Sequence, residues 1–289
     1  MKPLTAMALA LTACAAWGYD WPAPDMQVVK TFGQRTDGAV LPGVEVQTLS
    51  PTLTAPENGD VLFVFRPDAQ DVQNLPSGLG GFVALAHDEN LRTVITHVSP
   101  DVAETKKNFR RGEPLGQAEV QPGVSLTHHR LFVFDQQLGE LVNPLLVFPP
   151  GPDTKAPLLL DVKATPEGQT QAVSLFGQGS LAVGYWNISI DVLDPPLPGT
   201  GKEPRGVYSV EAYLNGSEVF NTSLDSLLDK NGRWQIKGSG LMLDDVQVQD
   251  QEWKLGQVFL NQGTNILEIV VKDFQGNQAG KTFRILGVR

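Results

Sequence analysis

Short apolar runs, separated by Gly, Pro, Asn and Asp at intervals of about ten residues, dominate the hydrophobic pattern of this chain. Residues 61–65 and 82–86 are almost continuously apolar, as strands buried on both faces are. Helix is expected to be scarce, and the best candidate, residues 103–109, is short. The pattern therefore predicts an all-β protein.

Apolar and polar residues alternate with a period of two in the second half of the chain, for example at residues 187–192 and 210–214. Asn215-Gly216 follows the second of these runs and predicts a tight β-hairpin. Six to eight short antiparallel strands over roughly 130 residues are typical of a β-sandwich. Residues 223–230 and 193–205 look like insertions, and the second is expected to be an exposed loop rich in Pro and Gly.

A proline-rich stretch divides the chain. Residues 148–157 contain four prolines and a glycine, which cannot continue a helix or a central strand and favour a semi-rigid connector. With 289 residues and 41% apolar content, the chain can build two cores. We expect a first module at residues 19–147, a linker at 148–157 and a second module at 158–289.

The N-terminus is typical of an export signal. Lys2 precedes an apolar stretch that is too short to span a bilayer, so residues 1–18 are interpreted as a signal peptide cleaved after Gly18. The alternative is a lipobox at Leu11-Thr12-Ala13-Cys14, which would place a lipid anchor on Cys14. Cys14 is the only cysteine, so no disulfide framework is expected. Either interpretation places the protein in the periplasm or cell envelope, with no transmembrane helix in the mature chain.

The charge pattern excludes one class of partner. The formal net charge is −10 and the pI is near 4.9, whereas nucleic-acid binding requires clustered Lys and Arg. The sequence of the folded region contains no Gly-x-Ser-x-Gly elbow and no free thiol, so it offers no serine or cysteine nucleophile of these kinds for catalysis without a metal.

A series of segments between Thr31 and Pro144 has a recognisable order and spacing. The segments are Phe32-Gly33-Gln34-Arg35, Leu41-Pro42-Gly43-Val44-Glu45, Gly59-Asp60-Val61, Gly81-Phe82-Val83-Ala84-Leu85, Thr96-His97-Val98, Arg111-Gly112-Glu113-Pro114 and His128-His129-Arg130-Leu131. Together they resemble the LytM/lysostaphin-like zinc peptidases, which are peptidoglycan endopeptidases with an antiparallel β fold. The turn around Gly263-Thr264-Asn265 and Asp273 to Gly276-Asn277 resembles the final hairpin of immunoglobulin-like β-sandwich domains.

The resemblance assigns metal ligands to positions that hold Leu41, Glu45 and Leu131. A hydrolytic zinc site needs about three nitrogen, sulfur or carboxylate ligands, and leucine supplies none. The family's catalytic histidines fall on His97 and His129. The resemblance therefore implies a degenerate member with no metal and no cofactor, in which both histidines are vestigial. The alternative is a residual zinc site formed by Glu45, His97 and His129, with or without His128.

Three functions follow as expectations. The first is a non-catalytic protein that binds peptidoglycan or regulates a partner such as a cell-wall hydrolase. The second is a residual zinc metallopeptidase that cleaves peptidoglycan cross-links. The third is a structural component of an envelope assembly.

Overall fold

The structure is a computed structural model that describes residues 18–67, 78–119 and 126–289. Antiparallel β-sheets dominate it. Strands account for 53% of the described residues and helices for 6%, which confirms the predicted all-β class. Residues 1–17 of the proposed signal segment, including Cys14 and its lipobox, lie outside the described residues. Within the described residues no helix is both long and apolar enough to cross a membrane.

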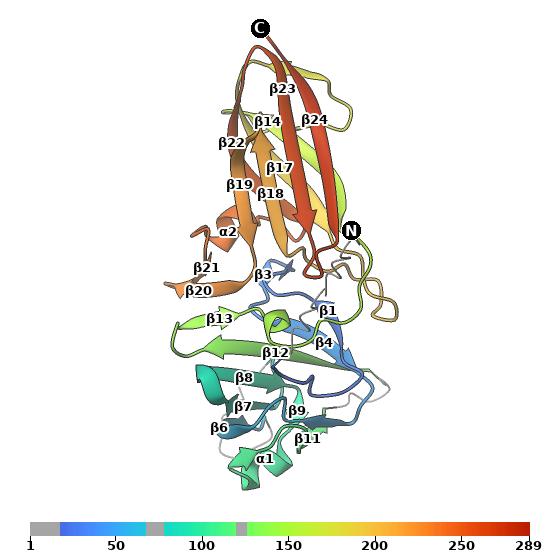
Figure 1. The fold of residues 1–289 in the computed structure, drawn as a ribbon, viewed down its shortest axis with the longest axis vertical. Helices are drawn as coiled ribbons and strands as arrows, with labels where there is room; N and C mark the ends of the chain where they lie inside the picture. Colours follow the sequence, from blue (N-terminus) through green and yellow to red (C-terminus); the bar gives the residue numbers. More distant parts are fainter. Residues whose placement is uncertain (1–17, 68–77, 120–125) are drawn as a thin grey trace, which may run out of the picture.

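The first part of the chain builds one large sheet with smaller sheets beside it (Figure 1). The large sheet runs β10-β6-β7-β8-β12-β13, and β4 pairs with both β12 and β1. Its strands are β1 (Gln27–Lys30), β4 (Val44–Thr48), β6 (Gly59–Phe65), β7 (Phe82–Ala86), β8 (Leu91–Thr96), β10 (Asn108–Phe109), β12 (Thr127–Asp135) and β13 (Glu140–Val142). The smaller sheets contain β2 (Arg35–Thr36) with β3 (Ala39–Val40), and β5 (Thr52–Thr54) with β11 (Pro114–Ala118) and β9 (Val98–Ser99).

Two further sheets from the second part of the chain face each other as a sandwich (Figure 1). Their inward side chains, including Ile190, Trp253 and Ile269, are buried. One sheet has β15 (Val173–Ser174), β14 (Leu158–Pro166), β17 (Gly184–Leu193) and β22 (Glu252–Leu260). The other has β16 (Ser180–Ala182), β24 (Gln278–Val288), β23 (Gly263–Lys272), β18 (Ser209–Leu214) and β19 (Ser217–Ser223). Asn215 and Gly216 connect β18 to β19 with positive φ angles, as the predicted hairpin requires.

Helical segments are short. They are α1 (Asp101–Thr105), α2 (Leu243–Val246) and the 3₁₀ turns Asp88–Asn90 and Pro144–Leu146. The prediction of helix over 103–109 was wrong in its second half, because Asn108 and Phe109 pair with β6 and the Phe109 ring is buried there. Burial of that ring in the sheet outweighs local helix propensity.

A hairpin from the second part of the chain completes the large sheet of the first part. β20 (Ser226–Lys230) pairs with β13, and β21 (Arg233–Ile236) follows it. Residues 223–230, interpreted from sequence as an insertion, therefore supply a strand that bridges the two modules. Leu227 is completely buried at this junction. Asn143 donates from its backbone N–H to the Asp225 carbonyl and from Nδ2 to the Leu224 carbonyl.

The loop at residues 193–205 is packed against the first module, so its prediction as an exposed loop was wrong in part: residues 198–199 and 201–203 are exposed and the rest are buried or half-buried. Leu197 and Arg205 are buried, and the Gly199 carbonyl accepts a hydrogen bond from Gln47 Nε2. Gln34 Oε1 accepts from the Gly206 N–H at 3.0 Å, while Gln34 Nε2 donates to the Pro204 carbonyl at 3.0 Å. The motif at residues 32–35 therefore contacts the second module.

At two positions of the junction, the backbone of one module lies so close to a side chain of the other that the residue there is glycine. A Cβ on Gly206 would lie 2.9 Å from Thr31 Oγ1, and a Cβ on Gly33 would lie 3.0 Å from Leu224 Cδ1. Gly33 also has a φ of +73°, which L side chains rarely adopt. Both glycines therefore allow the two modules to touch.

We predict that Leu227→Ala lowers the free energy of unfolding by about 2–5 kcal/mol, since the substitution leaves a cavity where two modules share one sheet. Urea unfolding at equilibrium measures this change. Leu160→Ala, at a position that is 49% exposed, is the matched control and should change stability by less than about 0.5 kcal/mol. Equal effects of both substitutions would contradict a structural role for the hairpin.

Candidate functional site

Strands β4 and β12 carry most of the candidate residues, and their pairing decides which side chains meet. Glu45 lies opposite Arg130, whereas Val46 lies opposite His129 and Val44 opposite Leu131. Directly opposite residues in an antiparallel pair project to the same face of the sheet. Glu45 and Arg130 therefore share the more open face, while His129 and Leu131 point into the core, where each is 1% exposed.

Three basic side chains surround the Glu45 carboxylate. His128 Nδ1 donates to Oε1 at 3.3 Å, Lys30 Nζ lies 3.4 Å from Oε2, and Arg130 Nε lies 3.8 Å from Oε2. The hydrogen bond from His128 and the charge of Lys30 outweigh burial and lower the pKa of Glu45 to about 2. Of the three positions where the resemblance places metal ligands, only position 45 carries a carboxylate. That carboxylate is thus already paired with cations.

His129 is held on both ring nitrogens. Nδ1 donates to the Thr96 carbonyl at 2.8 Å, which leaves Nε2 to accept from the Thr127 hydroxyl at 3.0 Å, in competition with the Thr48 carbonyl at 3.2 Å for the same proton. Burial lowers the pKa of His129, so the neutral ring is the stable form. Binding a metal through Nε2 would break the contact with Thr127.

Thr96 connects His129 to His97. The Thr96 hydroxyl accepts from the Arg130 backbone N–H at 2.7 Å, so its single proton is free to point to His97 Nδ1 at 3.1 Å. This arrangement leaves His97 with its proton on Nε2. Burial lowers the pKa of His97, and the Arg130 charge acts in the same direction, against the opposing effect of Glu119.

The His97 backbone is fixed in an unusual conformation. Its φ is +55°, a value that few residues other than glycine adopt. Its N–H donates to the Leu79 carbonyl at 3.0 Å, and its carbonyl accepts from the Glu119 N–H at 2.9 Å. A Cβ on Gly80 would lie 3.1 Å from the His97 ring and closer still to Glu119. Neighbouring segments therefore hold the ring in place.

The remaining candidates lie apart from one another. Leu41 is half-buried beside the β2–β3 hairpin, and its N–H donates to the Gln34 carbonyl. His87 is buried, with Nδ1 bonded to the Asn58 carbonyl and Nε2 to the Thr93 hydroxyl. In the part of the chain that the structure describes, Glu45, His97, His128 and His129 do not form a group whose ligand atoms converge.

Sequence reasoning missed Lys30, Thr96 and Arg130. Lys30 and Arg130 reach Glu45 only through strand pairing, and Thr96 acts through a hydroxyl and a carbonyl that carry no motif. Thr96 directly precedes His97 in the sequence, and this adjacency could have identified Thr96 as part of the site. Nothing local in the sequence indicates Lys30.

Comparisons with known proteins give limited matches. A model of an uncharacterised protein family matches residues 156–286. No curated protein matches this chain.

Two solved structures are similar to this chain. One is the crystal structure of a zinc-containing peptidase from Vibrio cholerae, with 19% identity and a TM-score of 0.28; the match covers 37% of this chain and only 32% of that one. The other is the solution structure of lysostaphin, with 11% identity and a TM-score of 0.33, where 91% of this chain and 94% of that chain are covered. Both TM-scores are low, so neither likeness carries an inference about the chemistry of this protein.

We predict that His129→Ala lowers the free energy of unfolding by about 2–4 kcal/mol, because it leaves a cavity and unpaired polar groups. The neighbouring His128→Ala is the matched control and should cost less than about 1 kcal/mol, because His128 is largely exposed. The folded pKa of His129 is lowered, so its contribution is present above the unfolded value of 6.5 and is lost as the pH falls below it. Chemical denaturation at about pH 7 and pH 5 measures how far acid lowers the free energy of unfolding. This decrease should be smaller in His129→Ala than in wild type. A larger effect of His128→Ala would contradict this assignment.

We predict that Glu45→Gln lowers the free energy of unfolding at pH 7 by roughly 1–2 kcal/mol, after allowance for solvent around its exposed partners. The depressed pKa makes the contribution of ionised Glu45 complete above its ordinary value of 4.5, and acid removes it as the pH falls toward about 2. The free energies of unfolding of Glu45→Gln and wild type, measured at several pH values, should therefore converge at the acidic end. Glu268→Gln, at an exposed position on β23, is the control. A constant difference at every pH would disprove the charge-based explanation.

Proposed function

We propose that this protein is exported and binds peptidoglycan, or regulates a cell-wall hydrolase, without cleaving the cell wall. The observation that carries the proposal is the state of the three positions where the resemblance requires zinc ligands. Leu41 and Leu131 offer no ligand atom, and the Glu45 carboxylate is paired with Lys30 and His128. Only a metal-activated water would cut the peptide, whereas shape and hydrogen bonds suffice to bind it.

The open face around Glu45 supports binding of peptide carboxylates. Lys30, His128 and Arg130 place three basic groups beside one acidic group, and His128 and Arg130 are 51% and 41% exposed. Arg pairs well with carboxylates in bidentate geometry. An acidic peptide is thus a better chemical match to this face than a cation.

Exposed apolar side chains on the sandwich favour a second candidate, a structural role in an envelope assembly. Tyr185 and Phe259 pack edge to face with ring centroids 4.9 Å apart, yet both remain more than two fifths exposed. Ile266, Leu286 and Val288 are exposed on the other sheet. Exposed apolar groups of this kind suit a protein contact.

Two measurements on the purified protein test the first proposal. After dialysis against micromolar zinc, elemental analysis should find less than about a tenth of an equivalent, because a stable site needs several preorganised ligands. The protein should also co-sediment with purified peptidoglycan, and Arg130→Ala should weaken this binding at least about tenfold. Arg284→Ala, an exposed arginine on β24, is the matched control and should bind as wild type does.

Other outcomes point elsewhere. Near one equivalent of zinc, together with release of soluble peptidoglycan fragments, would favour the residual metallopeptidase. Absence of both zinc and peptidoglycan binding would favour the assembly role, for which Tyr185→Ser with Phe259→Ser is the next test. Deleting residues 158–289 would be a poor test, since the deletion also removes β20 from the first sheet.

A further inference from the structure

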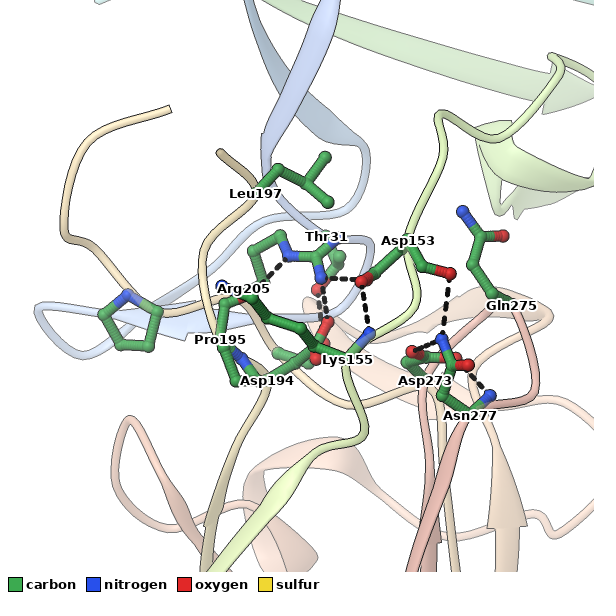
Figure 2. A network of polar contacts seen from close by, with 12 residues as sticks. Thr31, Asp153, Lys155, Asp194, Pro195, Leu197, Arg205, Asp273, Gln275 and Asn277 are labelled. Carbon is green, nitrogen blue, oxygen red and sulfur yellow. Dashed lines mark hydrogen bonds and ion pairs between the residues drawn. The ribbon is translucent and has the colours of Figure 1, made fainter. Parts of the chain in front are cut away.

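Three aspartates meet where the linker, the 193–205 loop and the turn after β23 come together (Figure 2). Asp153 belongs to the linker, Asp194 follows β17, and Asp273 follows β23. Each offers a carboxylate oxygen within 4.8 Å of the others. Across residues 18–67, 78–119 and 126–289, no other group of three or more His, Cys, Asp or Glu side chains converges in this way.

The buried charges of this cluster do not balance. Arg205 Nη2 donates to Asp153 Oδ2 and to Asp194 Oδ2, the latter at 2.5 Å. All four side chains are nearly inaccessible to solvent. When all three aspartates are ionised, one guanidinium opposes three carboxylates, which leaves two negative charges where ionised groups are costly unless paired.

Asp194 carries the unsatisfied atom. Its side chain is 1% exposed, and its Oδ1 has no hydrogen-bond donor among the described residues. The other two carboxylates accept local N–H bonds, Asp153 Oδ1 from Lys155 at 3.0 Å and Asp273 from Asn277 at 2.9 and 2.7 Å. A buried oxygen without a partner costs about 1–3 kcal/mol, so this atom calls for a ligand.

A small cavity adjoins the cluster. It measures about 30 Å³ and is lined by Asp153, Asp194, Asp273 and Arg205, with Thr31 on the side of the first module. This volume is large enough for an ion or for a water molecule or two. Asp194, which carries the unpaired oxygen, is one of the residues that line it.

We propose that Asp153, Asp194 and Asp273 hold a calcium ion at the junction of the two modules. Every side-chain ligand is a carboxylate oxygen, with no histidine or cysteine in the group, which selects a hard cation. A charge of +2 balances the two carboxylates that Arg205 leaves unpaired. Magnesium retains several waters in strict octahedral geometry, whereas calcium accepts flexible, carboxylate-rich coordination in a confined space.

The bound ion would fix the position of the linker. Asp153 would be tied to both Asp194 and Asp273, and the same linker already accepts bonds from Gln275 and Asn277. Burial and the neighbouring Asp153 and Asp273 raise the pKa of Asp194 to about 7 against the opposing effect of Arg205. This inference is independent of whether the protein binds peptidoglycan.

Calcium binding to the whole protein tests the proposal. Equilibrium dialysis against about 1 mM CaCl2 at pH 8 should give about 0.5–0.9 bound equivalents, since extracellular calcium modules have dissociation constants near 10⁻⁴–10⁻³ M. Thermal unfolding in about 10 mM CaCl2 should show a Tm about 5 °C or more above that in a chelator. Asp194→Asn should lower the affinity at least about tenfold. Asp245→Asn, a largely exposed carboxylate paired with Arg233, is the matched control and should leave affinity unchanged.

The outcomes separate this site from adventitious binding. Less than about a tenth of an equivalent in wild type would overturn the proposal. So would unchanged affinity in Asp194→Asn with a native circular dichroism spectrum. If that variant does not fold, Asp273→Asn provides the same decision. An equal Tm shift with MgCl2 would overturn the assignment to calcium.

Discussion

The pairing of β20 with β13 sets the geometry of the whole molecule. An edge strand with free N–H and C=O groups would otherwise end the first sheet at β13. The second part of the chain covers that edge and buries Leu227 beneath it, and Asn143 bonds to the backbone at residues 224 and 225. Because the sheet itself crosses the boundary, the orientation of the modules depends on this pairing as well as on the stiffness of the linker. The contacts of Gln34 and Gly206 add a second fixed point.

The two charge clusters show how the balance of partners decides the direction of a pKa shift. Glu45 is one carboxylate among three basic groups on a partly open face, and its pKa falls to about 2. Asp194 is one of three carboxylates around a single guanidinium in a buried place, and its pKa rises to about 7. Both make ion pairs of ordinary geometry. Burial and the remaining charges separate them, so the presence of a salt bridge alone says little about protonation.

Local patterns were sufficient for the fold class and for turns. Asn215-Gly216 encodes its hairpin through positive φ angles, and the alternating run at residues 187–192 became β17. The failures all involve distant contacts. Residues 226–230 form a strand that pairs with the edge of β13 and with β21, and the loop at 193–205 became partly buried through Arg205 and Leu197. Periodicity within a segment carries no information about such partners, so neither outcome could be derived from the residues concerned.

Prediction of the candidate site from sequence was limited because alternate residues of a strand face opposite sides of its sheet. His128-His129-Arg130-Leu131 alternates between two faces, and the sequence does not show which alternate pair faces Glu45, because histidine occupies one position of each pair. The register with β4 resolves this: His128 and Arg130 share the face of Glu45, while His129 and Leu131 lie in the core. A shift of one residue exchanges the faces of an entire strand. A metal site that includes Glu45 would therefore draw its β12 ligands from positions 128 and 130. Arg130 at the second of these positions brings a permanent positive charge where a cation would have to bind.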